Sequence, residues 1–194
     1  MSIASSKVIF FGSTSVGKTT LINRWCDNEF DPYKLPTLGV GTRNTLVEID
    51  GVEHNFQIWD TAGQDEYSNT TQIYFKNANG GMLVFDISRK ESFNDLSKWI
   101  EKFVSVEPKS PIVIVGNKCD LENREVSYDD AQKFAANLGY KYFETSAKNG
   151  FGVEEAFSTL FTEAVSSETP NETEKCSVDI ASPEKNTQKQ GCKC

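Results

Sequence analysis

The sequence predicts an α/β fold, a mostly parallel six-stranded sheet with one antiparallel edge strand and helices on both faces. Short apolar, β-rich segments alternate with amphipathic segments of helical period, an order typical of parallel sheets with right-handed crossovers. Residues 82–85 and 112–115 are apolar throughout, as in strands that are covered on both faces. A glycine-rich turn separates the first strand from the first helix. Ligands of such folds bind at the carboxyl ends of the strands.

The first half of the chain predicts a strand at residues 7–11, a helix at 18–26 and a loop over 27–36. Two strand-like runs between residues 42 and 60 flank Asp50-Gly51, a strong hairpin signal, and supply the antiparallel pair. The expected core positions of this hairpin are Leu46, Ile49, Phe56 and Ile58. Residues 61–75 are polar and lack a clean period.

The second half predicts helices between strands. A capping box of Ser127 and Asp130 begins a helix over 127–138, which Gly139 ends. A last strand at 140–145 leads to a helix over about 153–165. An earlier covering helix is predicted from the helical spacing of Phe93, Leu96, Trp99, Ile100 and Phe103.

Composition indicates one globular domain over residues 1–165 and a disordered tail over 166–194, because apolar side chains nearly vanish beyond Ser166. The net charge of −8 argues against a nucleic-acid partner, which would need a wide basic surface. The five cysteines lack zinc-ligand spacing and no cleavable signal precedes them, so we expect the reducing cytosol. No apolar run approaches the roughly 18 residues of a membrane span.

The turn after the first strand has the spacing of a phosphate-binding loop: Gly12, four residues, then Gly17-Lys18-Thr19. Such a loop turns its backbone N–H groups inward, and the following helix adds its free N–H groups and positive dipole end. Lys18 is expected to reach the β- and γ-phosphates and Thr19 a Mg²⁺ ion. The predicted phosphate contacts are Ser13, Thr14, Ser15, Val16, Gly17, Lys18, Thr19 and Thr20.

Asp60 ends the second hairpin strand, where its carboxylate could hold Mg²⁺ through water. The N–H of Gly63 could meet a γ-phosphate, which would place Gln64 beside the reacting phosphorus. A glutamine there can orient the attacking water without a shifted pKa, because this chemistry depends on positioning and electrostatics.

Asn117-Lys118-Cys119-Asp120 follows the fifth strand and predicts a guanine site. The Asp120 carboxylate can accept from N1–H and from the 2-amino group of guanine, whereas adenine offers neither donor. After the next strand, Ala147 could present its N–H to guanine O6, between Ser146 and Lys148. The guanine preference disfavours an ATPase or a kinase.

With these motifs the sequence resembles the Ras superfamily of small GTPases, the small G domains among P-loop NTPases, over residues 7–165. Residues 83–86 and 92–96 with Trp99 make it most similar to the Rab family. The resemblance implies a switch I threonine, Thr37, that meets Mg²⁺ and the γ-phosphate, and Phe30 edge-on to guanine. It implies switch II at 61–75, catalysis by Lys18, Thr37 and Gln64, and a metal shell of Thr19, Thr37 and Asp60.

Three departures from the family pattern bear on partners and rate. Gly41-Thr42 stands where Rab proteins usually have Asp-Phe, so one aromatic of the effector surface is absent while Trp59 and Tyr74 remain. Residues 65–67 make switch II more acidic, which alters docking of exchange factors or activators. Thr14-Ser15 places side chains near the γ-phosphate where faster relatives have glycine, which predicts slow intrinsic hydrolysis.

The chain ends with Cys192 and Cys194 around Lys193, which resembles the doubly geranylgeranylated end of Rab proteins. The resemblance implies a GTP/GDP switch in vesicular trafficking, with a monomeric G domain that cycles between cytosol and the cytoplasmic face of an intracellular membrane. Its implied partners are an exchange factor, a GTPase-activating protein, a GDP-dissociation inhibitor and effectors. The alternative is a nucleotide-locked interaction module with negligible turnover, motivated by Thr14, Ser15 and the altered switches.

Overall fold

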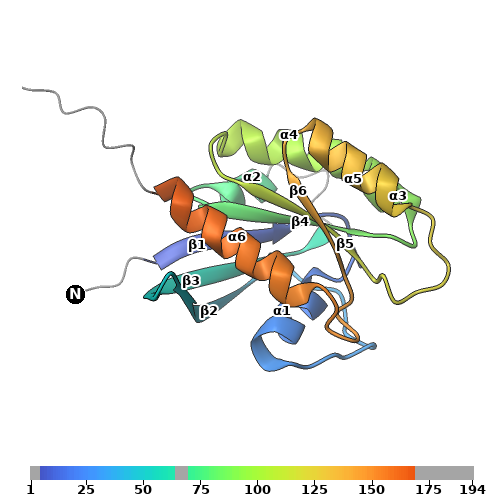
Figure 1. Cartoon of the computed structure of the whole chain (residues 1–194), viewed down its shortest axis with the longest axis horizontal. Helices are drawn as coiled ribbons and strands as arrows, with labels where there is room; N and C mark the ends of the chain where they lie inside the picture. Colours follow the sequence, from blue (N-terminus) through green and yellow to red (C-terminus); the bar gives the residue numbers. More distant parts are fainter. Residues whose placement is uncertain (1–4, 64–69, 169–194) are drawn as a thin grey trace, which may run out of the picture.

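Six strands form one sheet in the order β2-β3-β1-β4-β5-β6, in a computed structural model that describes residues 5–63 and 70–168 (Figure 1). Only the pair β2–β3 is antiparallel among the described strands, which confirms the predicted fold class. The elements in chain order are β1 Ser5–Phe11, α1 Lys18–Asp27, β2 Val40–Ile49, β3 Val52–Thr61, α2 Thr70–Phe75, β4 Gly80–Asp86, α3 Lys90–Asn94, α4 Leu96–Val106, β5 Ile112–Asn117, α5 Tyr128–Asn137, β6 Lys141–Thr145 and α6 Val153–Glu168.

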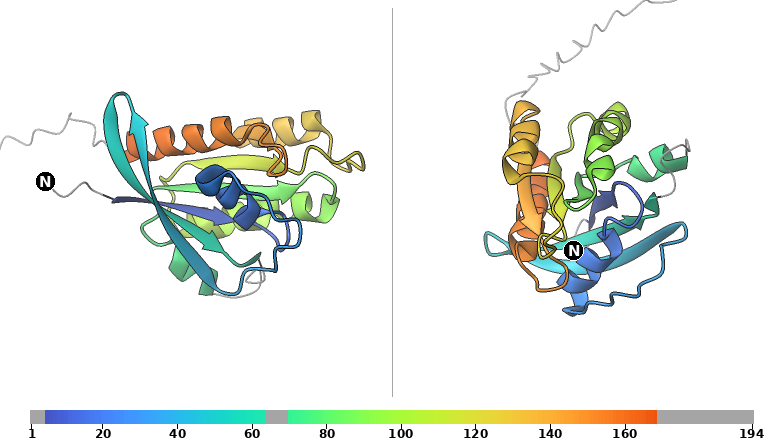
Figure 2. Two further views of the ribbon diagram at one scale, coloured as in Figure 1. Left: turned by 90° about the horizontal axis from the view of Figure 1, so that it is seen from below. Right: turned by 90° about the vertical axis from the view of Figure 1, so that its right-hand side faces the viewer.

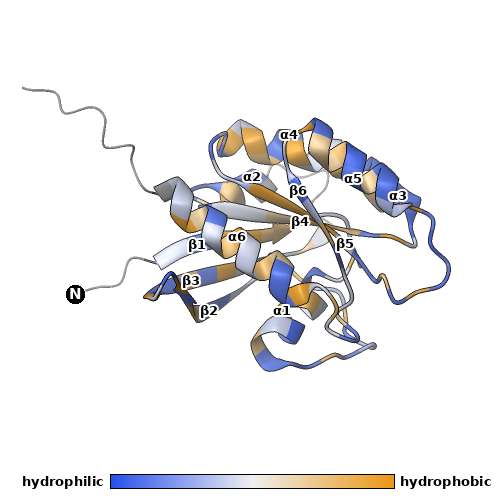
Figure 3. Cartoon of the chain, viewed as in Figure 1, coloured by the Kyte–Doolittle hydropathy of each residue, from blue (hydrophilic) through white to orange (hydrophobic). Residues whose placement is uncertain are grey.

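The sheet separates two apolar cores, and β1 contributes to both because successive side chains point to opposite faces. Val8 and Phe10 pack with residues of α1 and α6, whereas Ile9 and Phe11 pack with α2, α4 and α5. The two views of Figure 2 show helices on both sides of the sheet. Every residue of β4 and β5 is buried, as their continuous apolar runs predict, and Figure 3 shows β4 in the apolar colour.

None of the described helices is long and apolar enough to cross a membrane.

The predicted hairpin core is right at three of four positions. Phe56 and Ile58 are buried and Ile49 packs against the core, but Leu46 is 58% exposed. The prediction of Leu46 was wrong because residues 47 and 49 of a strand share one face, so Val47 packs against the core and Leu46 points away from it.

Three segments differ from the prediction in their helices. The periodic segment from Phe93 to Phe103 folds as α3 and α4, joined at Asp95. The polar stretch 61–75 contains the short helix α2. Helix α6 continues to Glu168, beyond its expected end at Val165, and the Ser167 hydroxyl donates to the Ala164 carbonyl at 2.8 Å in its last turn.

The predicted capping box of α5 is confirmed. The Ser127 hydroxyl accepts from the Asp130 N–H at 3.1 Å and donates to the Asp130 carboxylate at 2.7 Å. Gly139 follows the helix with φ of +77°, the left-handed conformation that glycine adopts without steric cost.

Candidate nucleotide site

A cavity of about 560 Å³ opens at the carboxyl ends of the parallel strands, a volume typical of small-molecule sites. Its walls come from the loop after β1, the segment between α1 and β2, and the loops after β3, β5 and β6. The residues from the sequence prediction that line it are Thr14, Ser15, Gly17, Lys18, Thr19, Thr20, Phe30, Thr37, Gly63, Asn117, Lys118, Asp120, Ala147 and Lys148.

Five predicted residues are not on this wall, and one of them is Asp60, whose carboxylate accepts from Thr19. Ser13, Val16 and Ser146 are buried behind it, where Ser13 and Ser146 hold neighbouring side chains by hydrogen bonds. Gln64 lies outside the described residues. The lining adds residues that the sequence did not single out: Asp31, Pro32, Lys34, Leu35, Pro36, Thr61 and Leu121.

Two glycines of the phosphate-binding loop are required by both conformation and space. Gly12 and Gly17 have φ of +130° and +99°, values that side chains other than glycine rarely adopt. A Cβ on Gly12 would overlap the Val84 carbonyl oxygen, and one on Gly17 would overlap the Asn117 side-chain amide. The loop therefore lies directly on β4 and on the residue that ends β5.

Lys18 extends back along this loop. Its ammonium donates to the carbonyl oxygens of Gly12 at 2.8 Å and Ser13 at 3.0 Å. Burial lowers the pKa of Lys18 to about 8, and the charge of Asp60 opposes that shift. A multiply charged phosphate ligand would favour the protonated lysine, so the cavity holds a buried cation suited to phosphate.

Three oxygen-bearing side chains from three elements meet beside Lys18. The Thr19 hydroxyl lies 2.6 Å from the Thr37 hydroxyl and donates to Asp60 Oδ2 at 2.6 Å. Thr37 donates to the same carboxylate oxygen at 3.4 Å. Thr19 is the second residue of α1, Asp60 stands near the end of β3, and Thr37 belongs to the segment before β2. The structure thus brings together the three predicted metal residues.

The Asp60 carboxylate is suited to a cation. Burial raises the pKa of Asp60, against the hydrogen bond from Thr19 and the charge of Lys18. Its Oδ1 atom is buried and has no hydrogen-bond partner within residues 5–63 and 70–168. Mg²⁺ prefers oxygen ligands and binds through one or two carboxylates plus phosphates and waters. Thr19, Thr37 and Asp60 therefore fit Mg²⁺, which would neutralise phosphate charge when bound.

We expect Thr19→Asn to make nucleotide binding less dependent on Mg²⁺ and to favour GDP over GTP, because the amide replaces a hydroxyl of the metal shell. The measurement is the affinity for GTP and GDP with Mg²⁺ and with EDTA. In the unchanged protein, chelation should weaken GTP binding. A variant whose GTP affinity responds to Mg²⁺ as strongly as that of the unchanged protein would contradict this role for Thr19.

Asn117 joins two loops of the site. Its side-chain N–H donates to the Val16 carbonyl at 2.9 Å, and its Oδ1 accepts from the Thr145 hydroxyl at 3.2 Å. The Ala147 N–H points to the same oxygen at a longer 3.4 Å, so it remains available to a better acceptor. The amide of Asn117 therefore ties the phosphate-binding loop to the loop after β6.

Lys118 crosses the site from β5 to the phosphate-binding loop. Its ammonium donates to the Ser15 carbonyl at 2.9 Å and lies 2.6 Å from Asp86 Oδ2. Burial disfavours the charge of Asp86, yet hydrogen bonds from Lys118 and Ser88 outweigh it and lower the pKa of that carboxyl. Asp86 thus fixes the head of Lys118 and leaves its alkyl stem along the cavity wall.

Asp120 is oriented by the loop after β6. The Ser146 hydroxyl donates to its Oδ1 at 2.6 Å, and the Lys148 ammonium lies 3.9 Å from its Oδ2. The carboxylate keeps acceptor capacity for a ligand, because each oxygen has two lone pairs.

Two further residues support the site without a sequence signal. Arg89 donates to the Thr14 carbonyl at 2.6 Å, and Asp86 holds Lys118. Asp86 ends β4 and Arg89 follows it, and each stabilises a loop that is distant in sequence. A lone arginine or aspartate has no spacing that could predict such a contact.

The aromatic residues that the sequence places on an effector surface lie next to each other. The rings of Trp59 and Tyr74 are 6.5 Å apart, and the Lys7 ammonium sits 3.9 Å from the Trp59 ring centre. Lys7 also donates to the Tyr74 carbonyl at 2.6 Å, which connects α2 to the strands. Thr42 pairs with Trp59 across β2 and β3, so the small side chain stands beside that aromatic pair.

Comparisons with known proteins agree with this geometry. The sequence model of the Ras family matches residues 7–166. The chain is 40% identical over 159 residues to "Ras-related protein Rab11A" of Lotus japonicus, which covers 81% of this chain and 70% of that protein. It is 41% identical over 157 residues to "Ras-related protein Rab-11B" of Dictyostelium discoideum (80% and 71%) and 39% identical over 157 residues to "Ras-related protein Rab-8B" of Pongo abelii (79% and 75%). The chain therefore belongs to the Ras family of small GTPases and is, within it, a member of the Rab family.

Proposed function

We propose that this protein is a Mg²⁺-dependent GTP/GDP switch that hydrolyses GTP slowly and recruits effectors in membrane trafficking. The observation that carries the proposal is the position of Thr37, which reaches Thr19 and Asp60 from an exposed segment. Its neighbours Leu35 and Leu38 are 82% and 86% exposed, so little apolar packing holds this segment. Loss of a contact at the metal site would therefore release this segment. Switch segments change conformation in this way when the γ-phosphate is lost.

Each residue of the site has a role in this proposal. Lys18 and the backbone N–H groups of the phosphate-binding loop hold the β- and γ-phosphates and stabilise charge on the oxygens during transfer. Thr19, Thr37 and Asp60 would hold Mg²⁺, which would supply positive charge against the negative charge of the phosphates. Asp120 and the Ala147 N–H select guanine. Gln64 orients the attacking water, a role taken from the family pattern.

The runner-up is a nucleotide-locked module without meaningful turnover. The observation that favours this alternative is the position of Thr14, which lines the cavity and whose carbonyl accepts a hydrogen bond from Arg89. The two functions are separated by single-turnover phosphate release from the GTP-loaded protein, with and without a GTPase-activating protein. Release that an activator accelerates supports the switch, whereas absence of release under both conditions supports the locked module.

Gln64→Leu is expected to keep GTP affinity and to slow phosphate release by roughly 10- to 100-fold, because the water loses its orienting amide while the phosphate contacts remain. The measurement is single-turnover hydrolysis, with and without activator. Gln72→Leu is the matched control, since Gln72 is an exposed glutamine on α2. Equal hydrolysis rates in the Gln64 variant and the unchanged protein would assign Gln64 another role.

We further propose that Cys192 and Cys194 each carry a geranylgeranyl chain and that both chains are needed for stable membrane residence. Residues 166–194 hold four lysines and five acidic residues, a net charge of −1, so they supply little attraction to anionic lipid. One lipid chain alone gives marginal, reversible binding. Recycling through the cytosol would then need a carrier such as the GDP-dissociation inhibitor of the family.

Replacement of either Cys192 or Cys194 by serine should move much of the protein to the soluble fraction without changing GTP affinity. Fractionation of cells and intact-mass analysis of the purified protein measure both effects. Cys176→Ser is the matched control, because Cys176 lies in the same tail but outside the Cys-x-Cys end. Unmodified terminal cysteines, or a double-serine variant that still sediments with membranes, would rule the anchor out.

A further inference from the structure

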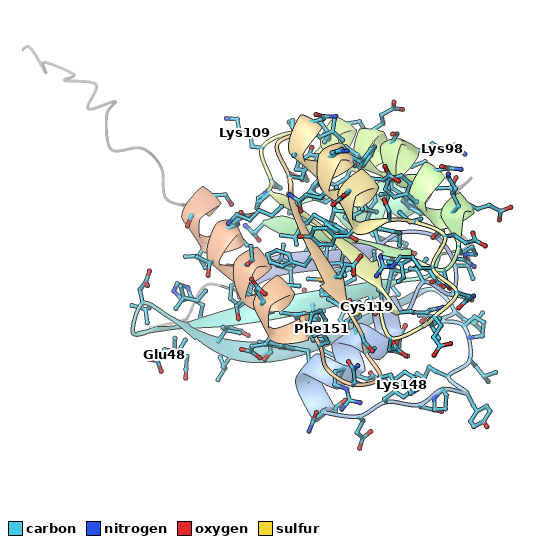
Figure 4. All side chains as sticks on the ribbon, turned by 45° about the vertical axis from the view of Figure 1, so that its right-hand side comes forward. Glu48, Lys98, Lys109, Cys119, Lys148 and Phe151 are labelled. Carbon is cyan, nitrogen blue, oxygen red and sulfur yellow. The ribbon has the colours of Figure 1, made fainter. Side chains whose placement is uncertain are left out.

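Arg24, half-buried on α1, uses three nitrogens of one guanidinium to join two walls of the cavity. Its Nε donates to the Ala147 carbonyl at 2.7 Å, and its Nη2 donates to the Lys148 carbonyl at 2.8 Å. Its Nη1 donates to both the backbone carbonyl and the side-chain oxygen of Asn28, each at 2.9 Å. Figure 4 shows Lys148 beside α1, in agreement with these contacts.

The first pair of contacts acts on the base-binding loop. Ala147 and Lys148 follow β6 and lie 123 and 124 residues from Arg24 in the sequence. The hydrogen bonds to both consecutive carbonyls restrain the peptides that follow Ala147, next to the peptide that carries the Ala147 N–H. That preceding peptide is also held through its carbonyl, because Ser146 accepts from the Gly150 N–H at 2.8 Å, while the Ala147 N–H itself makes only the weak 3.4 Å contact to Asn117. Arg24 therefore holds the chain on the C-terminal side of Ala147 and, together with the Gly150 contact, sets where the Ala147 N–H points.

The second pair of contacts acts on the opposite wall. Asn28 caps α1 with φ of +54°, and Phe30, which lines the cavity, follows two residues later. An asparagine in the left-handed conformation is uncommon, and the two hydrogen bonds from Arg24 stabilise it. The same guanidinium therefore fixes the start of the segment that carries Phe30 and the loop that carries Ala147.

We propose that Arg24 is a positioning residue for guanine recognition, which fixes the Ala147 N–H toward O6 of the base and so slows nucleotide release. The inference rests on the proposed binding of guanine nucleotides. Water could not hold the two backbone carbonyls in the same positions, because the fork of the charged guanidinium matches both acceptors at once. Arg24 has no contact with the base in this role.

The role predicts an effect that depends on the base. We measure the affinity and the release rate of GDP, of inosine diphosphate, which keeps O6, and of the diphosphate of 2-aminopurine riboside, which lacks O6. Arg24→Ala should weaken GDP and inosine diphosphate by about tenfold or more, the order of one charge-assisted hydrogen bond. It should weaken the 2-aminopurine nucleotide by less than about threefold, because that base offers the Ala147 N–H no acceptor and loses only the contribution of the Phe30 segment, which all three nucleotides share.

Arg43→Ala is the matched control. Arg43 also contacts α1, through Asp27 and a 3.0 Å hydrogen bond to Asn23, but it does not touch the loop after β6. We expect its affinities for the three nucleotides to stay within about threefold of those of the unchanged protein. If Arg24→Ala does not fold, Arg24→Lys takes its place, since one ammonium cannot reach the three acceptor residues together and the same base dependence is expected.

Equal weakening of all three nucleotides, or no weakening of GDP, would overturn the role of Arg24. Failure of the proposed function has a different signature, because the unchanged protein would then bind GDP no better than ADP. Loss limited to GDP and inosine diphosphate, with the Arg43 variant unaffected, supports the inference.

Discussion

Asp120→Asn should lower GTP affinity by roughly 10³-fold or more and raise affinity for xanthosine triphosphate, because the amide no longer accepts from both N1–H and the 2-amino group. Xanthine carries an oxygen at position 2, which the new N–H group can meet. Ser146 donates to Asp120 at 2.6 Å and would donate equally to an amide oxygen, so the substitution preserves the local fold. Competition binding with GTP, ATP and xanthosine triphosphate measures the exchange of specificity.

Glu122→Gln is the control for this exchange, since it removes a carboxylate from an exposed position two residues along the same loop. Its preference for GTP over xanthosine triphosphate should be that of the unchanged protein. Equal affinity of the unchanged protein for ATP and GTP would remove the basis for the role of Asp120.

Lys18→Met should abolish measurable nucleotide binding and yet stabilise the nucleotide-free protein at neutral pH. Burial lowers the pKa of Lys18 to about 8, against 10.5 for a free lysine, so the folded state disfavours the charged form. This cost is fully present below pH 8 and disappears as pH rises from 8 towards 10.5, with a magnitude on the order of 3 kcal/mol. Methionine fills a similar volume without a charge.

The difference in free energy of unfolding between Lys18→Met and the unchanged, nucleotide-free protein should therefore favour the variant at pH 7 and shrink at pH 9.5. Denaturant unfolding at the two pH values measures it. Lys109→Met is the control, because Lys109 is exposed and Figure 4 shows it on the opposite side of the molecule from Lys148, which lines the cavity. A variant that is less stable than the unchanged protein at pH 7, with nucleotide removed from both, would show that the buried ammonium stabilises the fold.

Much of the fold and site follows from local sequence. Residues 12–19 have glycines at two positions where the backbone is left-handed, and a lysine and a threonine where the helix begins. The strand, the turn and the helix can therefore be predicted together. Continuous apolar runs predict the buried strands β4 and β5, and Ser127 with Asp130 predicts the start of α5. Each of these signals lies within a few residues, where backbone sterics and short hydrogen bonds decide the conformation.

The tertiary structure decided what depends on contacts between distant segments. The sequence alone predicts which loops carry the phosphate, metal and guanine chemistry that we propose, because each loop holds its own reactive side chains. It did not determine that Leu46 faces away from the core, that Asp86 neutralises Lys118, or that Arg24 holds the carbonyls after β6. Packing across the sheet sets the register of a strand and decides which residue lies beside a long charged side chain. The energies of this packing are summed over partners that are far apart in the chain.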